Sequence, residues 1–167
     1  MTSFETLENR FIHKVEEDPD FFEYYKALED VAERVTHERI MGYLFEAVDF
    51  LALQIESSNV DFTDYNEMDE CFNFSLTKKE IGLLSSLMFQ IYLSRSIAYL
   101  KTMEVNWASA DLKTFDPSNA RSTFMTMYNK IYDENQVLIN QYVSRDRKSG
   151  ALVGIDYTAY SSVDGDT

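Results

Sequence analysis

The sequence predicts an all-α fold, a small helical bundle of four to five helices with an extended C-terminal arm. The chain of 167 residues contains only two prolines and five glycines, and three of these glycines lie beyond residue 149. Proline and glycine are the residues that helices tolerate least, so the first 149 residues are almost free of helix breakers. Hydrophobic residues make up 45% of the chain, which suits a folded core. We therefore expect a helical bundle domain over residues 1–149 and an interaction arm over residues 150–167.

The first predicted helix runs from Ser3, a suitable cap, to about Val15, with apolar residues at spacings of three and four. A second helix begins at Asp18-Pro19, because aspartate caps helices well and proline fits the first helical position. An aromatic cluster follows, for which we weigh two uses, core packing and the anchoring of an interface. Its members include Phe21, Phe22, Tyr24 and Tyr25.

The third predicted helix is capped by Thr36 and reaches about Gln54. Apolar residues cover most of its sides, and a helix that is apolar on most sides is buried on most sides. We therefore expect this helix to lie at the centre of the bundle. Its apolar positions are Ile40, Tyr43, Leu44, Ala47, Val48, Leu51 and Ile55, with Phe45, Phe50 and Leu53 beside them.

A polar segment from Glu56 to Ser75 is predicted to be a long loop, and loops of this size are usually functional or interaction elements. Its acidic residues suggest calcium binding, which an EF-hand achieves with oxygen ligands at alternate positions and glycine at the sixth. In this chain Tyr65 takes a ligand position and Asn66 takes the place of the glycine, so we expect no such site. The acidic residues are Asp61, Asp64, Glu67, Asp69 and Glu70.

The strongest local signal in the sequence begins at Leu76. Thr77 and Glu80 form a capping box, in which each side chain bonds to the backbone N–H of the other residue. Leu76 and Ile81 occupy the two positions of a hydrophobic staple. The helix that follows is predicted to reach about Glu104.

The last core helix begins at Asp116-Pro117 and is predicted to end near Ser144, with cations in its last turn and Gly150 as its stop. Short connections favour antiparallel neighbours, so this helix and the preceding one should pack antiparallel. Trp107, in the connection between them, is expected to pack at least partly inward. The predicted apolar face of the last helix comprises Ala120, Phe124, Met127, Ile131, Leu138 and Tyr142.

The net charge of −14, from 29 acidic and 15 basic residues, is the strongest compositional signal. Phosphate-binding proteins gain affinity from lysine and arginine, so this balance argues against nucleic-acid binding. One explanation of the charge is solubility. The other is a surface that faces DNA without adhering to it, or that imitates the charge of DNA. No apolar run approaches the length of about 20 residues that a membrane span needs, so we expect no membrane association.

No catalytic or metal-binding motif is recognisable, so we expect a protein that is not an enzyme and uses no cofactor. The only histidines, His13 and His37, belong to no paired metal motif, and phosphate loops, nucleophile elbows and zinc spacings do not occur. His37 is predicted to be a surface residue in the first turn of its helix. Cys71 is the only cysteine, so it forms no internal disulfide, and its acidic surroundings disfavour a nucleophilic role.

Two features near the C-terminus predict contacts with other proteins. The basic cluster Arg145, Arg147 and Lys148 either offsets the dipole of the last helix or contacts an acidic patch on a neighbouring copy. The arm that follows has no helical period, yet it carries apolar side chains, and extended arms bind through backbone bonds and alternate side chains. It is expected to contact another subunit or a different protein, the alternative being that it folds back on its own bundle. Its predicted interface residues are Leu152, Ile155, Tyr157 and Tyr160.

Four stretches together resemble the head–tail connector (adaptor) proteins of tailed bacteriophages. They are Phe4–Phe11 at the start, Leu83–Met88 with Leu93 after the capping box, Phe115–Arg121, and Arg145–Arg147 before the arm. The resemblance extends over most of the chain and is one of layout. Connectors of this kind are small helical bundles that form a ring under the portal and extend a C-terminal arm onto neighbouring proteins.

The resemblance implies a virion structural protein that is assembled in the host cytoplasm and located at the junction of head and tail. It implies a homo-oligomeric ring below the portal that joins the DNA-filled head to the tail, with the portal protein and tail or stopper proteins as partners. DNA would pass through the ring without specific binding, and acidic side chains would face the passage. The rival interpretation is an acidic DNA mimic or inhibitor of a host DNA-processing enzyme, which explains the charge equally well.

Overall fold

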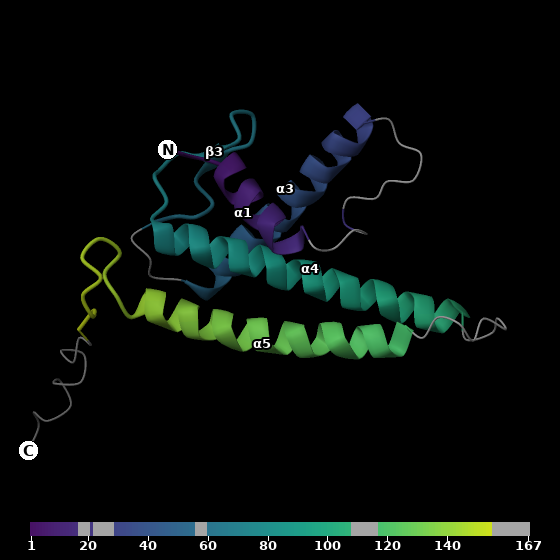
Figure 1. Cartoon of the computed structure of the whole chain (residues 1–167). Helices are drawn as coiled ribbons and strands as arrows, with labels where there is room; N and C mark the ends of the chain where they lie inside the picture. The colour runs from purple at the N-terminus through teal and green to yellow at the C-terminus, as the bar shows by residue number, and fades with distance from the viewer. Residues whose placement is uncertain (17–20, 22–28, 56–59, 108–116, 155–167) are drawn as a thin grey trace, which may run out of the picture.

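The structure, a computed structural model, describes residues 1–16, 21, 29–55, 60–107 and 117–154 (Figure 1). The predicted small helical bundle is confirmed, and the helices are accompanied by a three-stranded sheet of very short strands. The helices are α1 (Glu5–Val15), α3 (Glu29–Gln54), α4 (Lys78–Trp107) and α5 (Pro117–Val143), and the strands are β1 (Thr2–Ser3), β2 (Tyr65–Asn66) and β3 (Cys71–Phe72).

Helix α4 organises the bundle. Helix α5 runs antiparallel beside it, as predicted, while α1 and α3 contact α4 and each other (Figure 1). The apolar positions predicted for α3 are buried, from Ile40 to Ile55, but α4 is the helix that contacts all three others. The prediction that α3 is buried is therefore right, but the helix at the centre of the bundle is α4. Leu53, expected beside the apolar stripe, is 80% exposed.

Helix α3 starts earlier than the sequence predicts. Thr36 lies inside the helix, and its hydroxyl donates a hydrogen bond to the carbonyl of Ala32 at 2.8 Å. A threonine inside a helix can satisfy its hydroxyl in this way, so its presence does not require a helix start. Because neither proline nor glycine occurs between Glu29 and Thr36, the helical backbone continues unbroken through this stretch.

The described part of the segment predicted to be a loop, residues 60–75, instead folds against the N-terminus. Strand β3 lies between β1 and β2 and pairs antiparallel with both. Phe62 and Phe72 are buried, so the segment contributes to the core rather than only connecting helices. Ser3 belongs to β1, and α1 therefore begins at Glu5, whose N–H donates to the Ser3 hydroxyl at 3.2 Å.

Aromatic rings fill two regions of the core. Phe4 packs edge to face on Phe72 of β3, at a centroid distance of 5.2 Å. Between α1, α3 and α4, Phe21 packs on Phe11 and on Tyr92, each at 5.8 Å. Phe21 is 1% exposed, so this member of the predicted aromatic cluster is a core residue. Phe22, Tyr24 and Tyr25, together with the predicted cap at Asp18-Pro19, lie outside the described residues.

Helix α4 is long and apolar enough over Lys78–Thr102 to pass as a membrane span by length and composition, which the sequence analysis did not expect. Packing against three other helices explains its composition, because Leu84, Leu87 and Met88 are all buried in the bundle. An amphipathic pattern is weak in a helix that is covered on several sides. Trp107 is the last residue of α4, and the position of its side chain lies outside what the structure describes.

The apolar face of α5 differs in phase from the predicted one. Phe124, Ile131 and Tyr142 are partly buried as expected, whereas Met127 and Leu138 are 42% and 41% exposed. The fully buried position is occupied by a polar residue, Asn135, with buried Ile139 one turn later. The helix ends at Val143, seven residues before Gly150, which lies in the turn that follows.

Candidate functional site

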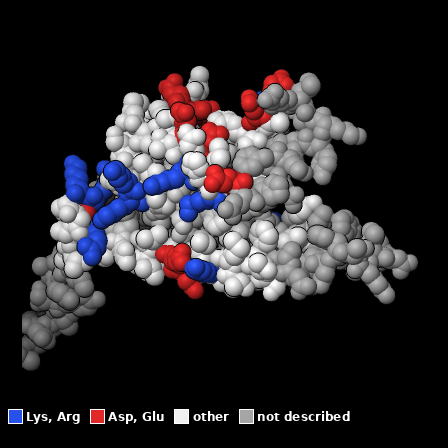
Figure 2. Space-filling view, in the orientation of Figure 1, with Lys and Arg blue, Asp and Glu red and all other residues white. Residues whose placement is uncertain are grey.

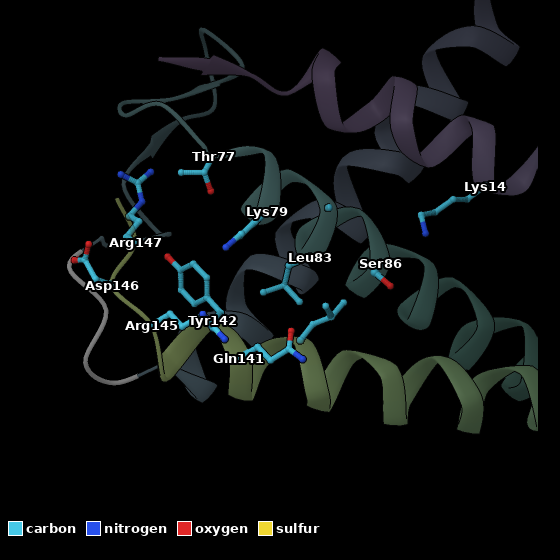
Figure 3. A pocket seen from close by; sticks show the side chains of 12 residues that line it. Lys14, Thr77, Lys79, Leu83, Ser86, Gln141, Tyr142, Arg145, Asp146 and Arg147 are labelled. Carbon is cyan, nitrogen blue, oxygen red and sulfur yellow. The ribbon is translucent and has the colours of Figure 1, made fainter. Parts of the chain in front are cut away.

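A groove lies where α4 begins and α5 ends (Figure 3), and its volume is about 630 Å³. Helix α4 contributes Lys79 and the buried Leu83, and α5 contributes Leu138 and Gln141. Lys14 reaches the groove from α1, so residues far apart in the sequence form its walls. The groove therefore combines an apolar floor with a polar rim.

A buried ion pair fixes one end of the groove. The Glu80 side chain is fully buried, and the Arg147 guanidinium donates to its two oxygens at 2.5 and 3.0 Å. The Tyr142 hydroxyl donates to the same carboxylate at 2.7 Å. The Thr77 N–H donates to Glu80 at 2.6 Å and the Glu80 N–H donates to the Thr77 hydroxyl at 3.3 Å, so the predicted capping box is confirmed.

These contacts keep Glu80 ionised although it is buried. Burial alone opposes the charge, but the hydrogen bonds from Arg147, Thr77 and Tyr142 outweigh it and lower the pKa of Glu80. Burial and the bond to Glu80 raise the pKa of the Tyr142 hydroxyl well above its usual range. A buried carboxylate needs such partners, so the start of α4 and the turn after α5 are held together.

The turn after α5 is closed by backbone hydrogen bonds. The Asp146 N–H donates to the Ala151 carbonyl and the Gly150 N–H donates to the Asp146 carbonyl, both at 2.8 Å. The Val153 N–H donates to the Ser144 carbonyl at 2.9 Å. Gly150 has φ of 70°, a left-handed conformation that glycine adopts without strain. The chain therefore leaves the bundle through an ordered turn.

Positive charge gathers around the groove (Figure 2), although the chain as a whole carries −14. Four cations line it, Lys14, Lys79, Arg145 and Arg147. Arg147 is bound to Glu80, while the other three form no ion pair with any residue that the structure describes. The one acidic residue of the lining, Asp146, accepts hydrogen bonds from Ser149 at 2.6 and 2.7 Å, which lower the pKa of its carboxyl, so its negative charge offsets one of the four positive charges. We call this feature the basic groove.

A second cation lies near Lys14. Partial burial and the charge of Arg10 lower the pKa of Lys14, and the charge of Glu134 only partly offsets this. Arg10 also borders the groove at Gly82, where an added Cβ would lie 3.8 Å from an Arg10 nitrogen. Like charges held this close favour the approach of an anionic group, because it would relieve their repulsion.

A second charged feature, the acidic hairpin (residues 61–72), lies apart from the basic groove. Asp61, Asp64, Glu67, Asp69 and Glu70 are all exposed on it. On the face that Figure 2 shows, acidic side chains lie over this hairpin, over the outer part of α3 and over the middle of α5, whereas basic side chains gather over the beginning of α4 and the turn after α5. On this face the basic groove and the acidic hairpin are therefore separate charged regions.

His37 connects the acidic hairpin to the helices, although its sequence position predicts a surface residue. Its Nδ1 lies 3.2 Å from the Glu8 carboxylate of α1, and its Nε2 lies 3.1 Å from Glu70 of the hairpin. Burial opposes charge on the ring, but the hydrogen bonds to Glu8 and Glu70 outweigh it and raise the pKa of His37. The residue is in the interior of α3 and only partly exposed, not in a first helical turn as predicted.

The predicted interface residues divide into three groups. Arg145 and Lys148 are exposed beside the basic groove, whereas Arg147 is committed to Glu80 within the chain. Leu152 forms a single bridge with Arg145, yet its side chain is 71% exposed. Ile155, Tyr157 and Tyr160 lie outside the described residues. The sequence gives only a weak signal for the groove itself. Lys14 and Lys79 are far apart in the sequence, and no local pattern shows that both line one groove.

Within the described residues, no group of three His, Cys, Asp or Glu side chains has the arrangement of a metal site. Cys71 is a partly exposed residue of β3. Comparisons with family models, curated proteins and solved structures found no match to this chain.

Proposed function

We propose that the chain is a virion structural protein, a head–tail connector that forms a ring below the portal and joins the DNA-filled head to the tail. Its partners would be further copies of itself, the portal protein, and tail or stopper proteins. DNA would pass through the ring without specific binding, since the acidic chain repels phosphates. The resemblance of the sequence to connectors and the observed small helical bundle support this proposal.

The observation that carries this proposal is the ordered turn after α5. The turn is pinned to the bundle by Arg147 and Glu80, yet Leu152 and Val153 at its end are 71% and 59% exposed. Exposed apolar side chains on a fixed support mark surfaces for protein contact. They stand where the predicted arm begins, so the arm would leave the bundle in a defined direction and dock on a neighbouring protein.

A truncation after Ser149 tests the proposal. The helices have their own caps and core, so circular dichroism of the truncated chain should match that of the full chain. Native mass spectrometry should show a ring for the full chain and smaller species for the truncated one. In a phage carrying this sequence, the truncation should yield DNA-filled heads that leak or fail to join tails.

A matched substitution separates the effect of losing the exposed apolar side chains from the effect of shortening the chain. Leu152→Ser with Val153→Ser removes only the exposed apolar side chains and should weaken assembly in the same direction. Met125→Ser with Val137→Ser removes two exposed apolar side chains of α5 away from this turn and serves as the control. Normal assembly of the truncated chain would refute the proposal, and so would its unfolding.

The alternative of a DNA mimic gains no support from the structure, because a DNA mimic has no need of a basic groove.

A further inference from the structure

The basic groove has an excess of positive charge, which would favour the binding of a negatively charged group. Lys14, Lys79 and Arg145 line a groove of about 630 Å³, a size typical of binding sites, and none of them forms an ion pair with a residue that the structure describes. The Arg145 guanidinium donates one hydrogen bond to the Gly150 carbonyl at 3.0 Å, which leaves its charge unneutralised. Its floor includes Leu83, which is 4% exposed, and its edge includes Leu138, which is 41% exposed. A suitable occupant therefore carries at least two negative charges around an apolar group.

The tip of the acidic hairpin has this composition. Met68 is 95% exposed, the most exposed of the chain's described large hydrophobic side chains, and it lies between the exposed Glu67 and Asp69. The tip is ordered, because the Asn66 side chain accepts a bond from the Met68 N–H at 3.0 Å and donates to Asp69 at 2.6 Å. Glu70 holds the base of the hairpin through His37. An unbranched methionine adapts to irregular apolar surfaces and is common at binding sites.

The tip cannot be the occupant of the groove in its own molecule. The exposure of Met68 shows that no part of the described chain covers it. The hairpin lies on the side of α1 and α3, whereas the groove opens between the start of α4 and the end of α5 (Figure 1). An approach of the two surfaces therefore requires a second molecule.

We propose that the acidic tip of one copy, Glu67-Met68-Asp69, docks into the basic groove of the next copy. Met68 would contact Leu83 and Leu138, while Glu67 and Asp69 would face Lys14, Lys79 and Arg145. Two different surfaces meet in such a contact, and repeated head-to-tail contacts close into a ring when the rotation between copies allows it. The proposal rests on the proposed function for its ring, and it names the surfaces that join the copies.

Charge reversals test this contact. Lys14→Glu with Lys79→Glu should raise the concentration needed for half assembly at least about tenfold, since close charge pairs across interfaces contribute more than about 1.4 kcal/mol. Glu67→Lys with Asp69→Lys should do the same. A chain that carries all four changes should assemble again, because each surface then meets its complement. Assembly is measured by sedimentation velocity and folding by circular dichroism.

Matched controls keep the net charge the same. Lys101→Glu with Lys130→Glu alters two exposed lysines away from the groove and should leave assembly near the wild-type level. Asp30→Lys with Asp133→Lys is the corresponding control for the tip. Higher salt should also weaken the wild-type assembly, as the Debye length falls from about 10 Å at 0.1 M to about 3 Å at 1 M.

The outcomes separate the two proposals. If the wild-type chain assembles and the groove and tip reversals act no more strongly than their controls, the docking contact is refuted and the connector proposal stands. If groove reversals act only while residues 155–167 are present, that segment is the occupant and the hairpin is not. A wild-type chain that remains monomeric at its highest soluble concentration overturns both proposals.

Discussion

Glu80 is a fully buried carboxylate whose partners come from three parts of the chain. Replacing Arg147 with alanine would leave this charge without its counter-ion, which is far more costly than losing a surface pair. We expect Arg147→Ala to reduce the free energy of unfolding by about 3 kcal/mol, measured by urea unfolding at low protein concentration. Arg145→Ala, which removes an exposed guanidinium in the same turn, should cost less than about 1 kcal/mol. Equal losses in the two variants would contradict this role of Glu80.

His37 should make stability depend on pH near neutrality. Its pKa is raised in the folded protein relative to the ordinary value of 6.5, so its contribution to stability is fully present below 6.5 and is lost as pH rises through the folded pKa. Wild-type protein should therefore lose stability over this range relative to His37→Gln. Melting temperatures at a series of pH values measure the difference. Parallel curves for wild type and His37→Gln would refute the prediction.

The sequence predicts the contacts between residues that are close in the chain, but not those between distant residues. The capping box is visible because Thr77 and Glu80 are three residues apart and helix geometry brings such positions together. The bond between Glu80 and Arg147 joins positions 67 residues apart, so only the packing of α4 against the turn after α5 creates it. For the same reason His37 was predicted to be a surface residue, since nothing local places Glu8 and Glu70 beside it.

At the scale of elements, the interface between α4 and α5 contains a polar pair inside an apolar region. Asn135 is fully buried, and its side-chain N–H donates to Gln90 at 2.8 Å, while its own oxygen has no partner in the described part of the chain. A buried acceptor without a donor costs about 1–3 kcal/mol. The hydrogen bond joins α4 to α5, and the oxygen without a partner reduces the net contribution of the pair to stability.

Paired substitutions would reveal this cost. Asn135→Leu alone should destabilise the protein by about 1–3 kcal/mol, because it leaves buried Gln90 without its donor. Adding Gln90→Leu should recover that loss and raise the melting temperature to the wild-type value or above it. Thermal unfolding of the single and double variants measures the coupling between the positions. A double variant as unstable as the sum of the two single ones would show that the pair is not coupled.

Local composition decides which elements were predictable from the sequence. The long helices were predictable because α3 and α4 are dense in apolar residues and almost free of breakers. The face of α5 was placed wrongly because its most buried position is Asn135, which a hydrophobic pattern does not count. Strands β2 and β3 were predicted to be loop, since two-residue strands are too short to show an alternating pattern and exist only through pairing with β1.

At the scale of the whole molecule, composition predicted the sign of the charge but not its distribution. A net charge of −14 gives no hint that Lys14, Lys79 and Arg145 would surround one groove. Their approach depends on α1, α4 and the turn after α5 meeting at one end of the bundle. The separation between the basic groove and the acidic hairpin is therefore a property of the fold, and the proposed contact between copies depends on it.

The single cysteine allows the number of copies in the proposed ring to be measured. Cys71 is partly exposed at the base of the acidic hairpin and is the only thiol in the chain, so a spin label attached to it marks one point in every copy. In a closed ring, the ratio of second-neighbour to first-neighbour label distances depends on the number of copies alone. Pulsed electron paramagnetic resonance on the labelled assembly should therefore return the stoichiometry directly. A single distance would indicate a dimer or a trimer, because the three labels of a trimer are equally far apart, and an unbounded series would indicate an open filament.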